Sequence, residues 1–258
     1  MCGRYYTDDD LEESLRSIKE IGDYLKFDSG TGPAREQSER SDHVPGGSGS
    51  VIMSAERSGI HDQGPDFRSP AARVGIAAAG NGRIELKNLR WGYPGFRQGA
   101  RIFNARAETA AEKGMFRRGI LGGRVVVPAS GFYEWNSRKE KYECRREDGE
   151  LMFMAGFADE FQMAAGGKDV NSEAAGMEAG GAKKDETESC FVILTTEANR
   201  SMKNIHSRMP LILEKEQIRK WIFDWEAARE ILKQVPAALE TSTPYEQLSL
   251  FGSMDQTY

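Results

Sequence analysis

The sequence is poor in cysteine and has no long hydrophobic run. Its 258 residues include 3 cysteines, Cys2, Cys144 and Cys190, which form neither a CxxC pair nor a zinc-ligand spacing. They form no disulfide framework, which fits a reducing environment. Because no apolar run reaches membrane-spanning length and no signal-peptide core is present, we expect a cytoplasmic protein without membrane contact.

Signature motifs of several enzyme classes are absent as well. The sequence contains no P-loop, no GxGxxG fingerprint, no GxSxG nucleophile elbow and no internal repeat. This pattern suggests no cofactor. Hydrophobic residues make up 39% of the chain, a low share that suggests that part of it is unpacked.

Basic residues concentrate in the middle of the chain, although the whole chain has a formal net charge of −5. Residues 90–146 contain 13 Lys or Arg and 5 Asp or Glu, a net charge of +8. Residues 159–188 contain 3 Lys and 8 Asp or Glu, a net charge of −5. The basic block is compatible with nucleic-acid binding and equally with a solvated surface.

The first four residues, Met1-Cys2-Gly3-Arg4, offer the most distinctive chemistry. Removal of Met1 is expected because the side chain of Cys2 is small, and it leaves an amine and a thiol on adjacent carbons. Such an amine forms a Schiff base with an aldehyde, and the thiol then closes a thiazolidine ring. α-Amines titrate at about 7.7–8.0 and thiols at about 8.5, so both nucleophiles are present near neutral pH. The alternative is an ordinary, functionless N-terminus.

Hydrophobic patterning predicts a β-rich chain. Strands are expected at residues 51–53, 74–78, 84–91, 124–128, 131–135, 141–146, 151–157, 190–195 and 211–213. The strands at 141–146 and 151–157 are expected to form a hairpin that turns at Asp148-Gly149. Helices are expected around residues 11–18, after residues 104–109 with an end near 116–118, and at 215–223 and 225–235.

Other stretches lack periodicity. Loops are expected at residues 28–50, 54–70 and 91–96, with a disordered insertion at 162–188 and a loop-like tail from 236. Because the strands do not alternate regularly with helices, a doubly wound fold is excluded. The pattern predicts an α+β fold with a mostly antiparallel, barrel-like sheet and peripheral helices.

Schiff-base chemistry at Cys2 needs side chains that transfer protons and orient the substrate. Glu134 lies in an apolar stretch, where burial would suit acid–base chemistry, although an exposed strand edge is the alternative. His206 precedes a strand and is a second proton-transfer candidate, but a lone histidine is often structural. Asn104 offers an amide donor or, alternatively, a helix cap.

Basic and aromatic side chains provide candidates for binding an anionic, base-containing ligand. The phosphate-binding candidates are Arg106, Arg117 and Arg208. The stacking candidates are Trp91, Phe96 and Trp135. Solvated arginines and core aromatics are the alternatives for both groups.

Several sequence blocks occur in an order that resembles one family. The blocks are 1–4 (MCGR), 91–92 (WG), 104–109 (NARAET), 127–135 (VPASGFYEW), 194–196 (LTT) and 206–210 (HSRMP). Together they resemble the SOS-response-associated peptidase (SRAP) family over about residues 2–235, outside the 162–188 insertion. The blocks at 104–109 and 128–135 are the most specific.

The resemblance implies recognition of abasic sites in single-stranded DNA and at junctions of single- and double-stranded DNA. It implies a thiazolidine crosslink between Cys2 and the ring-opened deoxyribose, after peptidase-type removal of Met1. Glu134 matches the acid/base glutamate of the family, and Asn104 matches the asparagine that orients the sugar and Cys2. His206 matches the histidine that assists ring opening and crosslink reversal.

The resemblance also implies a DNA-binding surface. Positions that contact DNA in the family are matched by Arg4, Arg106, Thr195 and Arg208, by the aromatic Trp135, and by Pro45 in a DNA-facing loop. With Arg117 and Trp91, these residues form the predicted DNA-binding set. Two alternatives stay open: an N-terminal-cysteine hydrolase of glutaminase or peptidase type, and a non-covalent single-stranded DNA binder.

The C-terminal region suggests a further partner. Residues 247–251 (QLSLF) resemble the peptide by which bacterial proteins dock on the replicative sliding clamp, and a terminal strand or a chance match is the alternative. We expect a monomer with one SRAP-like domain at residues 2–235 and a tail at 236–258, associated with the nucleoid when bound to DNA.

Overall fold

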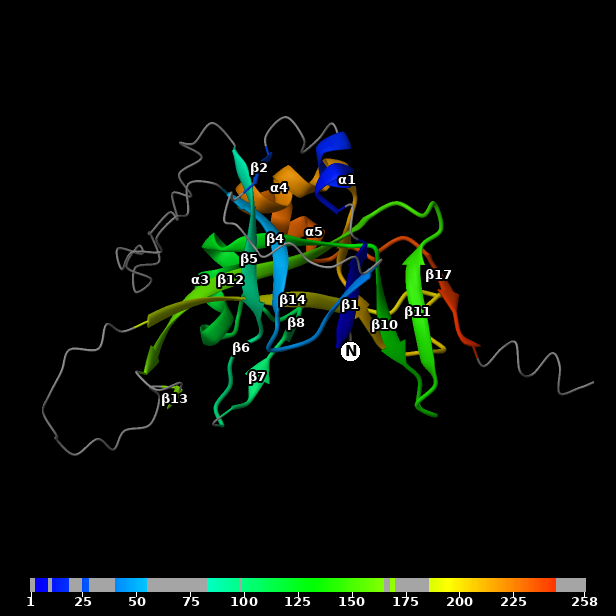
Figure 1. Ribbon diagram of the computed structural model, residues 1–258, viewed down its shortest axis with the longest axis horizontal. Helices are drawn as coiled ribbons and strands as arrows, with labels where there is room; N and C mark the ends of the chain where they lie inside the picture. The colour runs from blue at the N-terminus through cyan, green and yellow to red at the C-terminus, as the bar shows by residue number, and fades with distance from the viewer. Residues whose placement is uncertain are drawn as a thin grey trace, which may run out of the picture.

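A closed ring of five strands forms the centre of the molecule (Figure 1). The computed structural model describes residues 3–8, 11–18, 25–27, 40–54, 83–97, 99–164, 168–169 and 186–244. The ring contains, in spatial order, β12 (Met152–Ala164), β9 (Arg124–Ala129), β4 (Ser48–Ser54), β5 (Ile84–Trp91) and β14 (Glu186–Glu197). It closes because β14 also pairs with β12, which confirms the barrel-like sheet.

Short strands extend the barrel. They are β2 (Leu25–Phe27) beside β5, β8 (Asn104–Arg106) and β15 (Arg208–Pro210) beside β14, and β13 (Lys168–Asp169) and β16 (Ile212–Leu213) beside β12. A separate ribbon pairs β6 (Tyr93–Pro94) with β7 (Arg101–Ile102). The pairings β14–β5, β14–β8 and β2–β5 are parallel and the others described are antiparallel, so the predicted mostly antiparallel α+β fold is confirmed.

A second sheet packs beside the barrel, on the right in Figure 1. Its order is β17 (Leu239–Ser242), β11 (Lys141–Arg146), β10 (Gly131–Trp135), β1 (Arg4–Asp8) and β3 (Arg40–His43). One hydrophobic cluster joins the two sheets, since it contains Tyr5 and Phe132 from the second sheet and Phe191 and Ile193 from the barrel.

Helices cover the remaining faces of the barrel. They are α1 (Leu11–Ser17), α3 (Gly114–Gly122), the 3₁₀-helix η1 (Lys215–Gln217), α4 (Ile218–Phe223) and α5 (Trp225–Ile231). These positions confirm the helices expected near residues 11–18, 215–223 and 225–235. Of the helices in the described ranges, none is long and apolar enough to cross a membrane.

The strand patterns follow from the two cores. Strand β5 alternates as predicted within each half, with a break at residues 87–88. Ile84 and Leu86 join the cluster beneath the helices, whereas Leu89 and Trp91 join the cluster shared with the second sheet. Strand β9 is buried throughout because its two faces meet different cores: Val126 joins the cluster beneath the helices, whereas Val125 and Val127 join the cluster shared with the second sheet. The indole of Trp221 in α4 donates to the Val125 carbonyl and fixes the helix on this strand.

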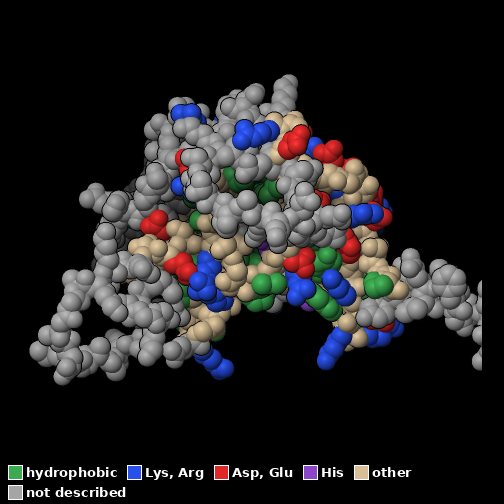
Figure 2. Space-filling view, viewed as in Figure 1, with side chains coloured by type: hydrophobic (Ala, Val, Ile, Leu, Met, Phe, Trp, Pro, Cys, Tyr) green, Lys and Arg blue, Asp and Glu red, His purple; other side chains and the backbone are tan. Residues whose placement is uncertain are grey.

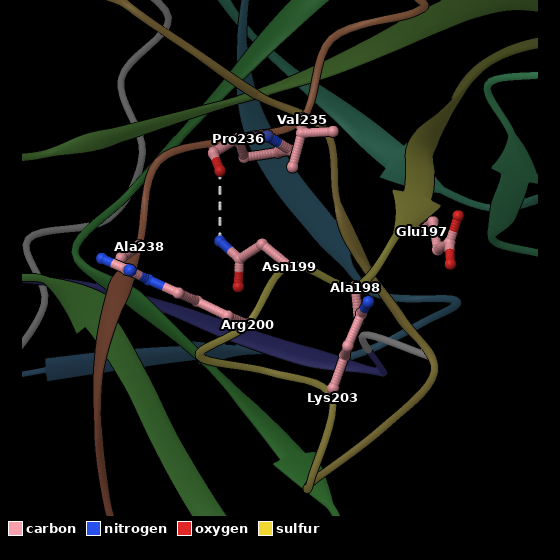
Figure 3. A pocket seen from close by; sticks show the side chains of 8 residues that line it. All are labelled: Glu197, Ala198, Asn199, Arg200, Lys203, Val235, Pro236 and Ala238. Atoms are coloured by element: carbon pink, nitrogen blue, oxygen red, sulfur yellow. Dashed lines mark hydrogen bonds between the residues drawn. The ribbon is translucent and has the colours of Figure 1, made fainter.

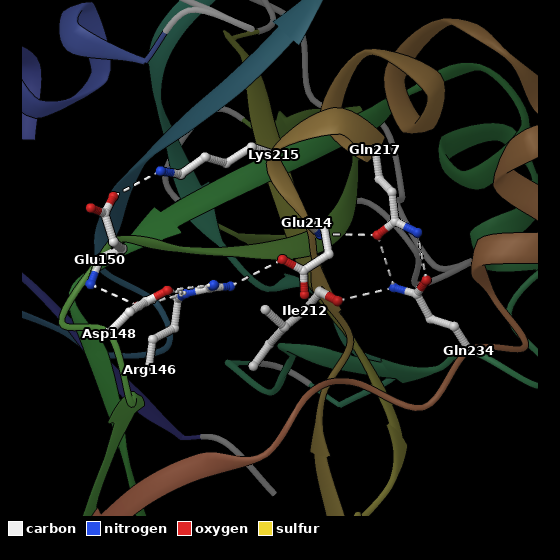
Figure 4. Close-up of polar contacts among 8 residues, drawn as sticks. All are labelled: Arg146, Asp148, Glu150, Ile212, Glu214, Lys215, Gln217 and Gln234. Carbon is white, nitrogen blue, oxygen red and sulfur yellow. Dashed lines mark hydrogen bonds and ion pairs between the residues drawn. The ribbon is translucent and has the colours of Figure 1, made fainter.

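The predicted hairpin between residues 141–146 and 151–157 is wrong. The turn at Gly149 exists, with φ +71° and its N–H donating to the Arg146 carbonyl, but it carries the chain from the second sheet into the barrel. Polar contacts anchor this crossover (Figure 4): Arg146 bonds Asp148 and Glu214, and Lys215 bonds Glu150. The hairpin is instead β10–β11, which turns through residues 136–140.

Other sequence expectations also need correction. Residues 104–106 form β8, and the helix expected to end near 118 begins at Gly114 and runs to Gly122. Part of the expected 28–50 loop forms β3 and the start of β4, and part of the expected tail forms β17. The edges of the expected insertion pair as strands, with Gln162 opposite Thr187. The expected 54–70 loop from residue 55 on and the 74–78 strand lie outside the described residues.

Candidate functional site

The pairing of β1 with β10 brings the start of the chain to a buried carboxylate. Arg4 lies opposite Tyr133, and Glu134 is the next residue of β10. Strand β10 lies between β1 and β11, so both its edges are paired. Glu134 on this strand is only 3% exposed. Glu134 Oε1 accepts the Trp135 N–H at 3.2 Å. The carboxylate is therefore buried as expected, whereas Met1 and Cys2 lie outside the described residues.

The thiols of Cys144 and Cys190 are poorly suited to act as nucleophiles. Burial, together with the nearby charges of Glu134 and Glu143, raises the pKa of Cys144 to about 12. Burial, together with the charge of Glu188, raises the pKa of Cys190 to about 12. A thiol with such a pKa carries almost no thiolate near neutral pH, so neither side chain suits nucleophilic chemistry.

Strands β8, β14 and β15 present a second group of candidate residues. Asn104 and Arg106 lie on β8, opposite Ile193 and Thr195 of β14. The Thr195 hydroxyl donates to the Ala105 carbonyl at 3.3 Å, and the Ala107 N–H donates to the Thr195 carbonyl at 2.8 Å. These bonds hold β8 against the barrel, with Asn104 half-buried and Arg106 exposed.

Arg208 begins β15, and His206 lies two residues before it. The Arg208 N–H donates to His206 Nδ1 at 2.9 Å. The Arg208 guanidinium forms a bidentate ion pair with Glu108, with N–O distances of 2.7 and 2.8 Å. Hydrogen bonds from Arg208 lower the pKa of Glu108 and keep it ionised. Sequence reasoning missed Glu108, because no local signal identifies a partner 100 positions away in the chain.

Trp91 connects the two groups from the core. Its ring contacts Tyr5 of β1 at 5.1 Å and Phe103 at 5.9 Å between centroids, and its indole N–H donates to the Phe103 carbonyl at 2.9 Å. Phe103 directly precedes Asn104. These contacts link β1, which carries Arg4, to the residue before Asn104 through one buried ring.

The segment between β3 and β4 also docks on Trp91. The Gly46 N–H donates to the Trp91 carbonyl at 2.7 Å, and the Trp91 N–H donates to the Gly47 carbonyl at 2.8 Å. Gly46 has φ +86°, a left-handed conformation that suits glycine. Half-buried Pro45 is held beside these bonds, so the predicted DNA-facing loop lies next to the site.

The surface beside these strands is hollow and basic. Figure 2 shows a concave lower edge with Lys and Arg side chains on both sides and hydrophobic and His side chains between them. In the matching ribbon view, the edge runs from the β6–β7 ribbon to the β10–β11 turn. Phe96 in the β6–β7 connection is 91% exposed, and Arg97 beside it is exposed as well.

The family comparison decides the identity of the chain. The sequence model of the SOS response associated peptidase (SRAP) family matches residues 1–248. The chain belongs to this family. The family resemblance expected from the six sequence blocks is thereby confirmed.

Curated relatives of this SRAP protein have related names. The abasic site processing protein YedK of Escherichia coli is 30% identical over 158 residues, which cover 60% of this chain and 62% of YedK. The abasic site processing protein YoaM of Bacillus subtilis is 29% identical over 179 residues, covering 65% of this chain and 70% of YoaM. The match therefore spans less than two thirds of YedK.

Solved structures support the fold. A protein from Bordetella bronchiseptica has a TM-score of 0.58 at 21% identity, covering 94% of this chain and 99% of that one. A phage-related protein of the same organism has a TM-score of 0.55 at 20% identity, covering 94% of this chain and 93% of that one. At these identities the likeness shows the shared fold alone.

Not every predicted site residue of this SRAP protein reaches the surface hollow. Trp91 is 1% exposed and Thr195 is fully buried, so both hold strands together and present no surface for stacking or contact. Arg117 is exposed on α3, which packs on β12. The 247–251 peptide lies outside the described residues.

Two predicted residues beside the N-terminus remain accessible. Arg4 is partly exposed and lies 3.7 Å from Asp42 of β3. Trp135 is half-buried at the end of β10. In the described part of the chain, no group of three His, Cys, Asp or Glu side chains could hold a metal ion.

A cavity of about 440 Å³ adjoins the loop that leads to His206 (Figure 3). Its lining includes Glu197, Arg200 and Lys203. Asn199 Nδ2 donates to the carbonyls of Pro236 and Ala237 and so ties this loop to the segment before β17. These two hydrogen bonds anchor the start of the loop that leads to His206.

Proposed function

We propose that this chain binds single-stranded DNA at abasic sites and forms a thiazolidine crosslink between Cys2 and the ring-opened deoxyribose. The crosslink would shield the lesion during the DNA damage response. The register of β1 against β10, which brings the start of the chain to buried Glu134, is the observation that carries the proposal. Membership of the SRAP family and relatives named abasic site processing proteins support it.

Chain connectivity limits where Cys2 can act. Cys2 is two residues from Arg4, and two residues of extended backbone span at most about 7 Å. Arg4 lies opposite Tyr133, so the proposal requires that Cys2 act beside the segment of β10 that contains Glu134. A nucleophile beside a buried carboxylate is the arrangement that proton-coupled attack on an aldehyde needs.

The proposed reaction is a condensation that releases water. The Cys2 amine adds to the aldehyde carbon, and loss of water gives an imine. The sulfur then adds to the imine carbon, and the nitrogen takes up the thiol proton. Glu134 accepts a proton during amine addition and returns it to the departing hydroxyl. Because both nucleophiles belong to one residue, ring closure is intramolecular and is favoured over imine hydrolysis.

Other residues prepare the sugar. We assign to His206 the proton transfer that opens the deoxyribose ring and assists reversal, and to Asn104 the orientation of the sugar. An abasic nucleotide has no base to unstack, so placing its sugar in a pocket costs little. Met1 must be removed first, because its peptide bond would otherwise occupy the amine. Mass spectrometry that finds Met1 intact in a crosslinking-competent sample would contradict the mechanism.

The basic hollow would hold the DNA backbone. Arg4 is partly exposed on β1 and Arg106 is exposed on β8, and the excess of Lys and Arg in residues 90–146 supplies further positive charge. Binding should therefore weaken with salt, since each neutralised phosphate of a single strand contributes about −0.7 to the slope of log K against log salt.

We retain residues 247–251 as a proposed sliding-clamp peptide. A titration with purified clamp that does not distinguish the intact chain from one truncated after Glu246 would exclude it.

The decisive experiment uses single-stranded DNA in which uracil-DNA glycosylase has made one abasic site. Wild-type protein should form a complex that survives denaturing electrophoresis, and Cys2→Ala should form none. Cys144→Ala is the matched control and should crosslink normally, because its thiol is buried. Crosslinking by Cys2→Ala, or Cys2-dependent release of ammonia from glutamine without crosslinking, would overturn the proposal.

A further inference from the structure

The ion pair of Glu108 with Arg208 directs the arginine toward protein acceptors. Both terminal nitrogens of the guanidinium donate to the two Glu108 oxygens, and Nη2 also donates to the Thr195 carbonyl. The Arg208 side chain is only 17% exposed. Bidentate, charge-assisted pairs fix the plane and position of a guanidinium. Arg208 is therefore built into the protein, with little of its surface left for a phosphate.

The backbone of Arg208 determines how the His206 ring is held. His206 Nδ1 lies 2.9 Å from the Arg208 nitrogen and 3.2 Å from its carbonyl oxygen. In the neutral ring, Nδ1 accepts the Arg208 N–H, so the ring hydrogen lies on Nε2. In the protonated ring, Nδ1–H can donate to the Arg208 carbonyl. One residue can thus hold the ring in both protonation states.

We propose that Glu108 is a positioning residue that controls the orientation and tautomer of His206 through Arg208. The inference rests on the proposed function, in which His206 transfers protons. Glu108 touches neither the ring nor the reacting atoms. It holds the Arg208 side chain, Thr195 on β14 helps to hold the same guanidinium, and the Arg208 backbone holds the imidazole.

The competing explanation is that Arg208 is a DNA ligand that Glu108 merely restrains. The two explanations predict opposite effects of Glu108→Gln. Glutamine keeps the size of the side chain, but its NH₂ group faces an Arg208 N–H in place of an acceptor oxygen. If Arg208 is a DNA ligand, Glu108→Gln should bind DNA more tightly and crosslink at least as fast as the wild type. If Glu108 positions His206, Glu108→Gln should crosslink more slowly, with an affinity for DNA that is unchanged or slightly higher.

The test measures affinity for undamaged single-stranded DNA and the crosslinking rate at saturating abasic DNA. We expect Glu108→Gln to slow crosslinking by about tenfold, part of the 10²–10⁴-fold typical of acid–base catalysis, without loss of affinity. Glu240→Gln is the matched control, since it removes a similar ion pair with Arg145 at the edge of the second sheet. An unchanged or increased crosslinking rate, or an equal loss of rate and affinity, would overturn the proposal.

A second measurement does not depend on crosslinking. Nitrogen NMR of the imidazole rings should show the Nε2–H tautomer for His206 in the wild type and a mixture in Glu108→Gln. The chain has only 3 histidines, so the spectrum of His206→Ala assigns the signal. The Nδ1–H tautomer in the wild type, or no change in Glu108→Gln, would overturn the role of Glu108. Absence of crosslinking by the wild type would instead overturn the proposed function.

Discussion

Arg4 of β1 lies directly opposite Tyr133 of β10. This register joins the beginning of the chain to a strand from its middle, and it sets Glu134 one position beyond the pair. The Glu134 carboxylate is buried there, on a strand that pairs with β1 at one edge and with β11 at the other. In the proposed mechanism, this arrangement allows Glu134 to transfer protons for the Cys2 amine.

Replacement of Glu134 by Gln should slow crosslinking by about 100-fold or more, because an amide cannot relay the proton. Affinity for single-stranded DNA should persist, since the side chain is buried. Quenched-flow sampling followed by denaturing electrophoresis measures the rate. Glu226→Gln, on the exposed surface of α5, is the control and should react like the wild type. A wild-type rate for Glu134→Gln would remove its assigned role.

Replacement of His206 by Ala should slow ring opening or crosslink reversal. The structure motivates this expectation because the Arg208 N–H orients the ring through Nδ1. Forward rates are measured as above, and reversal is measured by transfer of purified crosslinked protein to excess labelled abasic DNA. His43→Ala changes a histidine that stacks on Tyr5 in β1 and serves as a comparison. Unchanged rates in both directions for His206→Ala would refute the assignment.

Replacement of Phe96 by Ala should weaken non-covalent DNA binding by about 1–3 kcal/mol, the contribution of one aromatic–base stack. The ring is almost fully exposed beside the basic hollow, so its loss should not affect folding. Fluorescence anisotropy with labelled single-stranded DNA measures the effect. Val235→Ala removes another exposed apolar side chain and should bind normally. Equal affinities for Phe96→Ala and the wild type would exclude stacking by this ring.

Replacement of Gly131 by Ala should destabilise the second sheet by about 1–3 kcal/mol, the usual cost of overpacking. A Cβ atom at this position would collide with the Tyr6 hydroxyl and would lie 2.8 Å from the Cys144 carbonyl oxygen. Urea unfolding measures the change. Gly114→Ala is the control, because nothing lies within 4 Å of its added Cβ. Equal stability of the two variants would show that the sheet adjusts without cost.

The sequence alone determined the elements whose burial follows a simple local pattern. The alternation at residues 84–91 identified β5, and the valines at 125–127 identified β9, because these patterns report directly which faces meet a core. Ordered motif blocks identified the family, and the apolar setting of Glu134 predicted its burial. These features depend on neighbours in the chain, so they can be predicted from the sequence without knowledge of the fold.

Only the tertiary structure decided which segments meet. Local patterning shows that residues 141–146 form a strand, but only the fold shows its partners. They are β10, across the short turn at 136–140, and the distant β17, in place of β12. The same long-range packing buried Trp91, which its sequence context suggested as a stacking residue, and paired Glu108 with Arg208. Residue type predicts the chemistry that a side chain can perform, and the fold determines whether it faces DNA, the core or another side chain.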